Sequence, residues 1–505
     1  MAAFDIVVIG AGPGGYPAAI RAAQLGASVA LVEKEEMGGT CLNWGCIPTK
    51  TLIASSELFA RIKSAGAMGL RVENASYDYA AMADRKDQII QKLRNGIKQL
   101  LKANGVTVIQ GSASFQSRNQ IQVDPDVAPG FSPAGAALKG GATPESVILA
   151  AGKTIISTGA ASAMPGFLPR HERVVESRAF LNLRALPTST IILGGGIIGC
   201  EFACMLAQLG VKVTIVELLE DIVAVVDADV RRELRRHMEK TLGIRILTGV
   251  TLEEITADDR GVRGRVAVGA HGHAPLPDDH GVPGRTDREE LAADLLLVAL
   301  GRKPVTSSLK LENAGLTPNE RGFLDVDAYG RTNIATIYAV GDVTGGPLLA
   351  HAATSQGLVA AENACSRYLH KNETVVPNCI FTSPEIGTVG LSEQEAQQQG
   401  RKIKTGKYLM GAMGKALAIG EPIGFVKWVA DAETDQLLGA HAIGPHATDL
   451  IAEAAVAIRA ELTAADLAHT IHSHPTLAEA WMEAAHVLMG EPIHSAPPRK
   501  ETKSA

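Results

Sequence analysis

Two segments of the chain repeat one order of apolar and polar positions, from 6 to 36 and from 191 to 220. Each has an apolar run, a glycine-rich turn, an amphipathic stretch that ends at a glycine, a second apolar run and an acidic residue. This periodicity predicts a strand, a helix and a second strand in each copy. Corresponding residues differ by a constant 184 positions without a gap, as from Gly10 to Gly194 and from Glu33 to Glu217.

Each glycine-rich turn has the spacing of a dinucleotide-binding loop. In such loops the first glycine makes the tight turn, the second admits the pyrophosphate and the third lets helix and strand pack closely, while the helix amino terminus holds the phosphates. The acidic residue, 23 positions after the first glycine, lies where a carboxylate accepts hydrogen bonds from an adenosine ribose. A single motif of this kind is a weak signal, but two in register leave little room for plain glycine turns. The residues are Gly10, Gly12, Gly15 and Glu33 in the first copy, and Gly194, Gly196, Gly199 and Glu217 in the second.

The two sites are expected to hold different nucleotides. The second carries Glu217, Glu220 and Asp221 with no arginine beside them, and this negative charge would repel a 2′-phosphate. NAD is therefore favoured over NADP at the second site.

Two further apolar stretches end in residues that could contact a ligand. The first predicts a strand that ends at Gly341 and Asp342, in the stretch TNIATIYAVGDVTGG. Ligand-binding groups of α/β proteins lie at the carboxyl ends of parallel strands, although Gly-Asp is also common turn chemistry. Thr158 and Gly159 similarly end a strand, before a loop that resembles a crossover between domains.

Two other stretches, 124–146 and 269–290, are rich in proline, glycine and aspartate and lack periodicity, which predicts surface loops. The second contains three histidines that could bind a metal, but they lack the fixed spacing of a ligand set, so no metal site is predicted. These are His271, His273 and His280.

The composition restricts the kinds of protein that this chain can be. Its 505 residues suggest about three or four domains at roughly 100 to 200 residues each, and abundant glycine and aliphatic residues with few aromatics are typical of α/β proteins. A net charge of -6 without a basic stripe argues against a nucleic-acid partner. No apolar run reaches the roughly 18 residues of a membrane span, and the first residues lack the pattern of a secretory signal. We therefore expect a cytoplasmic protein with no membrane partner.

Cys41 and Cys46 lie five positions apart in GGTCLNWGCIPTK, just before an amphipathic helix over TLIASSELFARI. A helix amino terminus favours a thiolate, and Gly45 lets the backbone bend so that the two sulfurs can bond. In a reducing compartment, paired thiols indicate catalytic, redox or metal roles. Zinc needs about four ligands and no second cysteine pair supplies them; two buried core cysteines are the remaining alternative. Cys200 and Cys204, by contrast, lie among apolar residues and indicate core packing.

The stretch IHSHPTLAEAWMEAA contains a candidate base. His474 precedes Pro475, which holds it off the following helix, and Glu479 five positions later could orient the imidazole. Taken alone, one histidine of 14 is more often a surface or core residue than a base.

Together these motifs carry a family resemblance. The chain resembles the FAD-dependent pyridine nucleotide-disulfide oxidoreductases from Phe4 to about Gly490, through GAGPGG, GGTCLNWGCIPTK, GGGIIGCE, ALGRKP, YAVGD and HPTLAE. Within this family it is most similar to the members that oxidise protein-bound dihydrolipoamide with NAD. The resemblance implies an α/β fold with two Rossmann-like dinucleotide-binding domains, a central domain and an α+β carboxyl-terminal interface domain for dimerisation. The expected bounds are 1–160 for the FAD-binding domain with its redox disulfide, 161–300 for the NAD-binding domain, 301–350 for the central domain, 351–490 for the interface domain and 491–505 for a flexible tail.

The resemblance also implies roles for individual residues. Cys41 would exchange with the substrate's sulfur and Cys46 would face the flavin. Lys50 and Glu201 would form an ion pair beside the flavin ring. Asp342 would hydrogen-bond the flavin's ribityl chain, and His474 with Glu479 would come from the partner subunit as the base and its orienting group, which leaves His472 without that role. The expected FAD contacts are Gly10, Gly12, Gly15, Glu33, Thr40, Lys50, Thr158, Gly159 and Asp342, and the expected NAD contacts are Gly194, Gly196, Gly199, Glu201, Glu217 and Gly301.

The implied reaction is oxidation of protein-bound dihydrolipoamide to lipoamide through the Cys41–Cys46 disulfide and FAD, with reduction of NAD to NADH. The implied partners are a second copy of the chain, with active sites shared between subunits, and a lipoyl-bearing carrier of a 2-oxo acid dehydrogenase complex or the glycine cleavage system. An NAD(P)H-dependent reductase of another disulfide or of a quinone is the alternative. A non-enzymatic flavoprotein would be expected to lack the cysteine pair, and an oxygen-using NADH oxidase would use a single cysteine.

The chain departs from the family pattern after GGPLLAH. Members that act on lipoamide commonly have Lys-Ala and then Glu-Gly there, whereas this chain has Ala352, Ala353, Gln356 and Gly357. Two charges near the flavin and the interface domain are thereby absent, which leaves open the lipoyl carrier and leaves room for another disulfide or a quinone as substrate. The sequence does not indicate the direction of flux.

Overall fold

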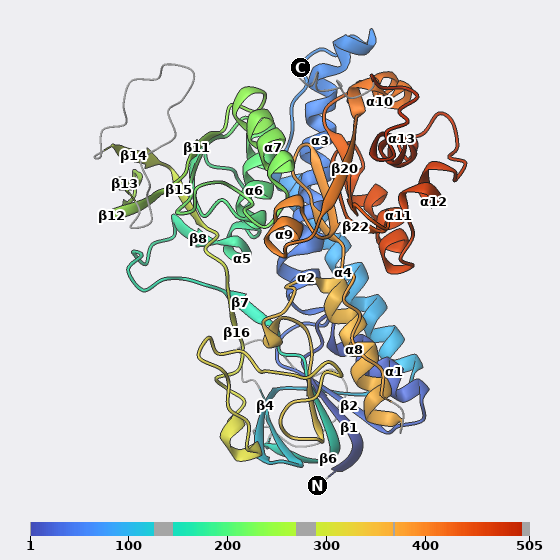
Figure 1. Cartoon of the computed structure of the whole chain (residues 1–505). Coiled ribbons are helices and arrows are strands. Elements are labelled where there is room, and N and C mark those ends of the chain that lie inside the picture. The colour runs from blue at the N-terminus through green and yellow to red at the C-terminus, as the bar shows by residue number, and fades with distance from the viewer. Residues whose placement is uncertain (1, 126–144, 269–288, 367–368, 497–505) are drawn as a thin grey trace. The chain divides into compact units, whose positions relative to one another are not determined.

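The computed structural model describes residues 2–125, 145–268, 289–366 and 369–496 (Figure 1). The chain divides into two compact units. The first consists of Met1–Thr51, Ala80–Ala163 and Gly301–Thr374, and the second of Leu52–Tyr79, Met164–Leu300 and Val375–Ala505. The bounds predicted for the four smaller domains stay a prediction.

A largely parallel sheet forms the centre of the first unit. Its strand order is β3-β2-β1-β6-β5-β4, and β17 pairs with the second half of β6, on the edge where β5 pairs with the first half. The strands that run parallel are β1 (Ala2–Ile9), β2 (Val29–Glu33), β3 (Thr107–Gln110), β6 (Val147–Ile156) and β17 (Ile337–Ala339). The strands β4 (Ser112–Ser117) and β5 (Gln120–Asp124) run antiparallel to their neighbours.

Alternate residues of β1 enter two different cores, because successive side chains of a strand point to opposite faces. Ile6 and Val8 pack into a core with residues of α1 (Gly15–Gln24) and α8 (Ala350–Cys365), two helices that lie side by side (Figure 1). Val7 and Ile9 pack into a core with the segment 309–324. The remaining elements of the first unit are α2 (Gly39–Trp44), α3 (Cys46–Ser64, which continues into the second unit), α4 (Tyr79–Ala103), β7 (Ala160–Ser162), β16 (Arg302–Pro304), η2 (Leu311–Ala314) and η3 (Gly341–Thr344). The short helix η1 (Ala65–Met68) follows α3 in the second unit.

The second unit contains the other parallel sheet. Its order is β11-β10-β9-β15-β8, and the apolar runs of the repeat at 191 and 212 supply β9 and β10. The bounds are β8 (Val174–Glu176), β9 (Ser189–Leu193), β10 (Lys212–Val216), β11 (Arg245–Leu247) and β15 (Leu295–Val298), with α5 (Ser177–Phe180), α6 (Ile197–Gln208) and α7 (Ala228–Lys240). An antiparallel sheet of β12 (Val250–Asp258), β13 (Gly261–Val268) and β14 (Glu290–Ala293) follows α7 in the chain.

The carboxyl-terminal part of this unit is an antiparallel sheet with helices packed on it. The order is β18-β19-β22-β21-β20, and the orange and red elements of Figure 1 show α11 and α13 beside these strands. Trp428 and Trp481 are both fully buried, with ring centroids 4.6 Å apart, and Trp428 Nε1 donates to the Trp481 carbonyl at 3.0 Å. The bounds are β18 (Asn378–Ile380), β19 (Glu385–Gly390), α9 (Glu393–Gln398), β20 (Ile403–Leu409), η4 (Met410–Ala412), α10 (Gly414–Ala418), β21 (Phe425–Asp431), β22 (Leu437–Gly444), α11 (Ala447–Arg459), α12 (Ala464–Ala468) and α13 (Glu479–Leu488).

The two strand–helix–strand units and the α+β carboxyl-terminal part confirm the predicted fold class. Most of the two predicted surface loops, the three histidines of the second and residues 497–505 of the predicted tail lie outside the described residues. Among the described residues, no helix has both the length and the apolar character needed to cross a membrane.

Candidate active site

Each glycine-rich turn requires glycine at its first and third positions. Gly10 has a φ of +98°, and Gly194 has a φ of +109°, a left-handed conformation that L side chains rarely adopt. A Cβ on Gly15 would lie 1.8 Å from the carbonyl oxygen of Gly10, and a Cβ on Gly199 would lie 2.0 Å from that of Gly194. The turn and the close helix–strand contact predicted from the spacing are therefore present in both copies.

The middle glycine of each turn is needed for a different reason. A Cβ on Gly12 would have its nearest neighbour at 3.9 Å, and one on Gly196 would meet nothing within 4 Å. Gly196 has an ordinary φ of -71°. Neither packing nor backbone strain demands glycine at these positions, so the missing side chain leaves open space at the helix amino terminus. Pyrophosphate approaches dinucleotide-binding loops at this place, and both loops therefore fit FAD and NAD.

The acidic residue at the end of the second strand is fixed by the glycine-rich turn. Glu33 Oε2 accepts the N–H of Ala11 at 2.6 Å, and Glu217 Oε2 accepts the N–H of Gly195 at 2.5 Å. In each copy the other carboxylate oxygen accepts the N–H two positions further on, at 2.8 Å. Burial raises the pKa of Glu33, although these two N–H groups oppose the increase. The hydrogen bonds of Glu33 therefore recur at Glu217, with the same offset of 184 positions that relates the two sequence segments.

Asp342 follows β17 at the carboxyl end of a parallel strand, as predicted. Arg302 Nε lies 3.4 Å from Asp342 Oδ2, and another nitrogen of the same guanidinium donates to Thr40 Oγ1 at 3.3 Å. Burial raises the pKa of Asp342, and the charge of Arg302 opposes this effect. The predicted FAD contacts Thr40 and Asp342 therefore share one arginine, which the sequence interpretation did not single out although it lies in ALGRKP.

Three other predicted nucleotide contacts lie beside β7 and β16. Thr158 Oγ1 donates to the carbonyl of Val305 at 2.7 Å. Gly159 and Gly301 have φ values of +69° and +98°, and a Cβ on either would meet nothing within 4 Å. Their contacts with a nucleotide stay predictions.

Cys41 and Cys46 lie together where α2 ends and α3 begins. Gly45 separates the two helices, and Cys46 is the first residue of α3. The Cys41 thiol hydrogen-bonds with the side chain and backbone of Cys46, and both residues are free thiols in this structure. The hydrogen bond with Cys46, burial and the charge of Cys46 raise the pKa of the Cys41 thiol well above its usual range, while the charge of Lys50 opposes this increase. The two sulfurs are placed for thiol–disulfide chemistry.

Lys50 and Glu201 belong to different units, so their ion pair stays a prediction. Within the first unit, Lys50 acts on Cys41 through its charge. Within the second, the buried carboxylate of Glu201 accepts the N–H of Phe381 at 2.9 Å.

His474 and Glu479 form the pair predicted for a base and its orienting group. His474 Nδ1 lies 2.8 Å from Glu479 Oε1, and Glu479 Oε2 accepts the N–H of Thr476 at 2.8 Å. The His474 side chain is 79% exposed, which leaves Nε2 accessible from solvent. Burial raises the pKa of Glu479, but the N–H of Thr476, the hydrogen bond from His474 and the charges of His474 and His472 outweigh it, so the pKa is lowered.

The departures after GGPLLAH lie in α8. Ala352 and Ala353 are buried, and a Cβ on Gly357 would lie 2.1 Å from the carbonyl oxygen of Gly14. Gln356 Oε1 accepts the N–H of Gly341 at 2.8 Å, next to Asp342. A neutral amide thus supports the turn that carries Asp342, a role the sequence did not indicate.

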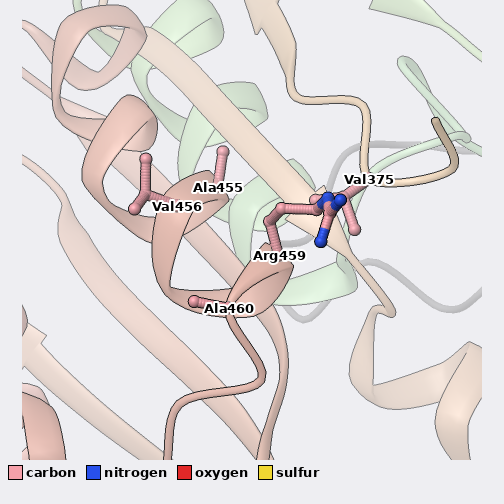
Figure 2. A pocket seen from close by; sticks show the side chains of 5 residues that line it. All are labelled: Val375, Ala455, Val456, Arg459 and Ala460. Atoms are coloured by element: carbon pink, nitrogen blue, oxygen red, sulfur yellow. The ribbon is translucent and has the colours of Figure 1, made fainter.

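A shallow hollow of about 340 Å³ lies on α11 (Figure 2). Val375, Ala455, Val456, Arg459 and Ala460 line it. None of these residues is a predicted catalytic or nucleotide contact, so this hollow is not the candidate site.

Known protein families, curated proteins and solved structures resemble this chain over nearly its whole length. The family model described as pyridine nucleotide-disulphide oxidoreductase matches residues 4–357, and that of the dimerisation domain of the same family matches residues 376–485. The dihydrolipoyl dehydrogenase of Chlamydia muridarum is 40% identical over 504 residues, covering 99% of both chains, and that of Halobacterium salinarum is 41% identical over 492 residues, covering 97% of both. Among solved structures, the HOCl-induced flavoprotein disulfide reductase RclA from Escherichia coli, in its Cu(II) complex, is 28% identical with a TM-score of 0.81, covering 97% of this chain and 100% of that one.

Proposed function

Because the chain belongs to the pyridine nucleotide-disulphide oxidoreductase family, we propose that it is an FAD-dependent dihydrolipoyl dehydrogenase that uses NAD. The observation that carries the proposal is the contact between the Cys41 and Cys46 thiols, in a chain with two dinucleotide-binding turns. The relatives of that name align with nearly the whole chain, which supports the same reaction.

The proposed reaction occurs in two balanced halves. In the first, one thiol of the substrate dithiol loses its proton and attacks the Cys41–Cys46 disulfide, so that the S–S bond opens and a mixed disulfide forms. The second sulfur of the substrate then closes the substrate's ring, and the protein dithiol is released with the two protons of the substrate. In the second, the protein dithiol becomes a disulfide again, and its two electrons and one proton reduce NAD to NADH while the other proton is released. The protein therefore cycles between a disulfide and a dithiol.

Each side chain of the proposed site has one role in this cycle. His474 Nε2 accepts the proton of the substrate thiol, and Glu479 holds the ring at Nδ1 and stabilises the imidazolium that forms. Cys41 exchanges with the substrate, Cys46 is its resolving partner, and the charge of Lys50 favours the thiolate of Cys41. Glu201 completes the predicted ion pair with Lys50.

Members of this family use FAD and NAD, and the residues of this chain fit both groups. The turn of Gly10–Gly15, with Glu33, Thr40, Thr158, Gly159 and Asp342, would hold FAD, and the turn of Gly194–Gly199, with Glu217 and Gly301, would hold NAD. When bound, the flavin supplies two-electron transfer between the thiols and the nicotinamide. The chain's own contribution is to place the thiols and to control their protonation.

We also propose that the working form is a homodimer in which His474 and Glu479 serve the thiols of the other subunit. The dimerisation domain that covers residues 376–485 supports this assembly. The partner in the reaction is then a lipoyl-bearing carrier protein.

Reduction of another disulfide is the second candidate function. Two observations favour it: the similarity to the disulfide reductase RclA, and the neutral residues Ala352 and Gln356 in α8. The absence of two charges beside the turn of Asp342 changes the surroundings of the flavin that the acceptor would meet.

A panel of acceptors separates the two functions. The purified flavoprotein is given NADH with lipoamide, with glutathione disulfide or with a quinone, and NADPH replaces NADH in parallel wells. The proposal predicts fast NADH-dependent reduction of lipoamide and slow reduction of the other acceptors. Faster reduction of another disulfide or of the quinone would replace the proposal with the second candidate.

A further inference from the structure

The His472 ring lies between two hydrogen-bond acceptors. Its Nδ1 is 2.9 Å from the carbonyl oxygen of Thr470, and its Nε2 is 2.7 Å from Glu453 Oε1 on α11. The side chain is only 6% exposed. A neutral imidazole has one N–H and can satisfy one acceptor, whereas an imidazolium has two. Both ring nitrogens of His472 are therefore held, one by each acceptor.

His472 belongs to the segment between α12 and α13 that also carries His474. The two rings lie in contrasting environments, because His472 is buried against α11 while the His474 side chain is 79% exposed. Little packing holds the His474 ring itself, so its position depends on Glu479 and on the backbone of this segment. His472 ties that backbone to Glu453, 19 positions earlier in the chain.

The charge of His472 also reaches the partner of His474. It is one of the groups that lower the pKa of Glu479, together with the N–H of Thr476 and His474, against the opposing effect of burial. Two other titratable groups interact with Glu479, namely Tyr408 of β20 and His494. Among the described residues, the groups that interact with His472 include Glu453 from α11 and Glu479 from α13.

We propose that His472, paired with Glu453, is a positioning residue for the His474–Glu479 pair. This proposal rests on the proposed function, in which His474 is the base. His472 fixes the segment that carries His474, and its charge favours the ionised form of Glu479. It touches neither substrate nor cofactor, so it acts through His474 and Glu479.

The test compares two reactions of the FAD-loaded protein. NAD reduction by dihydrolipoamide requires the thiols and His474, whereas NADH oxidation by ferricyanide requires only the flavin and the NAD site. In His472→Gln and in Glu453→Gln we expect kcat of the dithiol reaction to fall about ten-fold, through misplacement of the base, with KM for dihydrolipoamide little changed. Ferricyanide turnover and FAD content should stay at the parent level.

The pH profile gives a readout that a purely structural role would not move. Replacing His472 removes one of the charges that lower the pKa of Glu479, the partner of His474. The acid limb of kcat/KM for dihydrolipoamide should therefore move to higher pH in His472→Gln. The double variant should be no slower than the slower single variant, because the two residues act as one pair.

Two exchanges serve as matched controls. His469→Gln makes the same change at an exposed histidine at the end of α12, and Asp449→Asn removes an exposed carboxylate from the same helix as Glu453. Both should keep the turnover and pH profile of the parent.

The proposal is overturned if His472→Gln and Glu453→Gln keep the parent's dithiol turnover and acid limb. It is also overturned if they lose FAD and ferricyanide turnover together with the dithiol reaction, since that result would indicate a general structural role. His474→Gln tests separately whether His474 is the base. If this variant keeps full dithiol turnover, the role of His474 in the proposed function fails, and the positioning role of His472 fails with it.

Discussion

Glu217 Oε2 accepts a hydrogen bond from the N–H of Gly195 at 2.5 Å, across 22 positions of the chain. Glu33 and Ala11 make the same contact at 2.6 Å, also across 22 positions. Each carboxylate is therefore held by the turn that would carry the pyrophosphate, and the ribose and phosphate contacts of a nucleotide depend on one rigid unit.

Glu217→Gln should weaken NAD binding without affecting FAD. The exchange removes the charge that a ribose would bond and replaces an acceptor oxygen by an amide nitrogen. Hydrogen bonds to charged groups contribute about 1.5 to 3 kcal/mol, so KM for NAD should rise about ten- to hundred-fold. Steady-state kinetics with FAD content measured in parallel test this, and Glu253→Gln, an exposed acid of β12, is the control. Equal KM values in the two variants would contradict the assignment of Glu217.

Substitution by alanine should have different effects at two glycines of the second turn. At Gly199 the new Cβ would lie 2.0 Å from the carbonyl of Gly194, and overpacking of this kind costs about 1 to 3 kcal/mol. At Gly196 it would meet nothing within 4 Å, so the fold should be unchanged while the space for pyrophosphate is reduced. Thermal unfolding and KM for NAD measure both effects. A Gly196→Ala protein that binds NAD normally would show that this open space is not the pyrophosphate site.

Lys427→Met should destabilise the second unit. Lys427 Nζ lies 2.7 Å from Glu393 and 3.2 Å from both Asp227 and Asp229, and the side chains of Lys427 and Asp227 are 2% and 0% exposed. Removing one partner of a buried ion pair costs about 3 to 5 kcal/mol. The control is Lys402→Met, whose lysine is 81% exposed beside Glu433 and should contribute less than about 1 kcal/mol. Urea unfolding with similar midpoints for both variants would contradict this account.

The destabilisation by Lys427→Met should also depend on pH. Burial raises the pKa of Asp229, but Lys427 and Lys407 outweigh it and lower the pKa below the ordinary value of 3.8. A lowered carboxyl pKa stabilises the fold above the ordinary value and loses that effect as pH falls through the folded value. Burial lowers the pKa of Lys427, but Glu393, Asp227 and Asp229 raise it above 10.5, so its contribution is complete below that value and is lost at more alkaline pH. The difference between parent and variant should be largest near neutrality and shrink in strong acid.

Lys50→Met should slow alkylation of Cys41 in the reduced protein. The charge of Lys50 lowers the pKa of this thiol, so its removal raises the pKa further and reduces the thiolate that reacts. For an interaction on the order of 1 kcal/mol, iodoacetamide should react about five-fold more slowly at a fixed, mildly alkaline pH. Lys63→Met, in the last turn of the same helix, is the control. An unchanged rate would show that Lys50 does not act on Cys41.

Local sequence patterns predict much of this molecule because their physics is local. The glycines at 10, 12 and 15 and their copies 184 positions later determine the turns, the helix starts and the places of Glu33 and Glu217. The cysteine pair and the pair of His474 and Glu479 each lie within six residues, so one turn of backbone brings them together.

Contacts between distant elements carry no such signal. Arg302 meets Asp342 because β16 and β17 belong to the same unit, and no spacing in the sequence indicates that contact. His472 meets Glu453 only because the segment after α12 folds back onto α11. The family resemblance assigns the base to His474, and no spacing in the sequence indicates the contact between His472 and a glutamate on another helix.

The most direct measurement is the turnover of dihydrolipoamide with NAD by the parent protein, by Cys41→Ser and by Cys365→Ser. Cys365 is an exposed single cysteine at the end of α8 and controls for the exchange itself. We predict that Cys41→Ser loses the dithiol reaction yet still oxidises NADH with ferricyanide, while Cys365→Ser matches the parent in both reactions. A Cys41→Ser protein that still oxidises dihydrolipoamide at the parent's rate would contradict the thiol pair as the route of electrons.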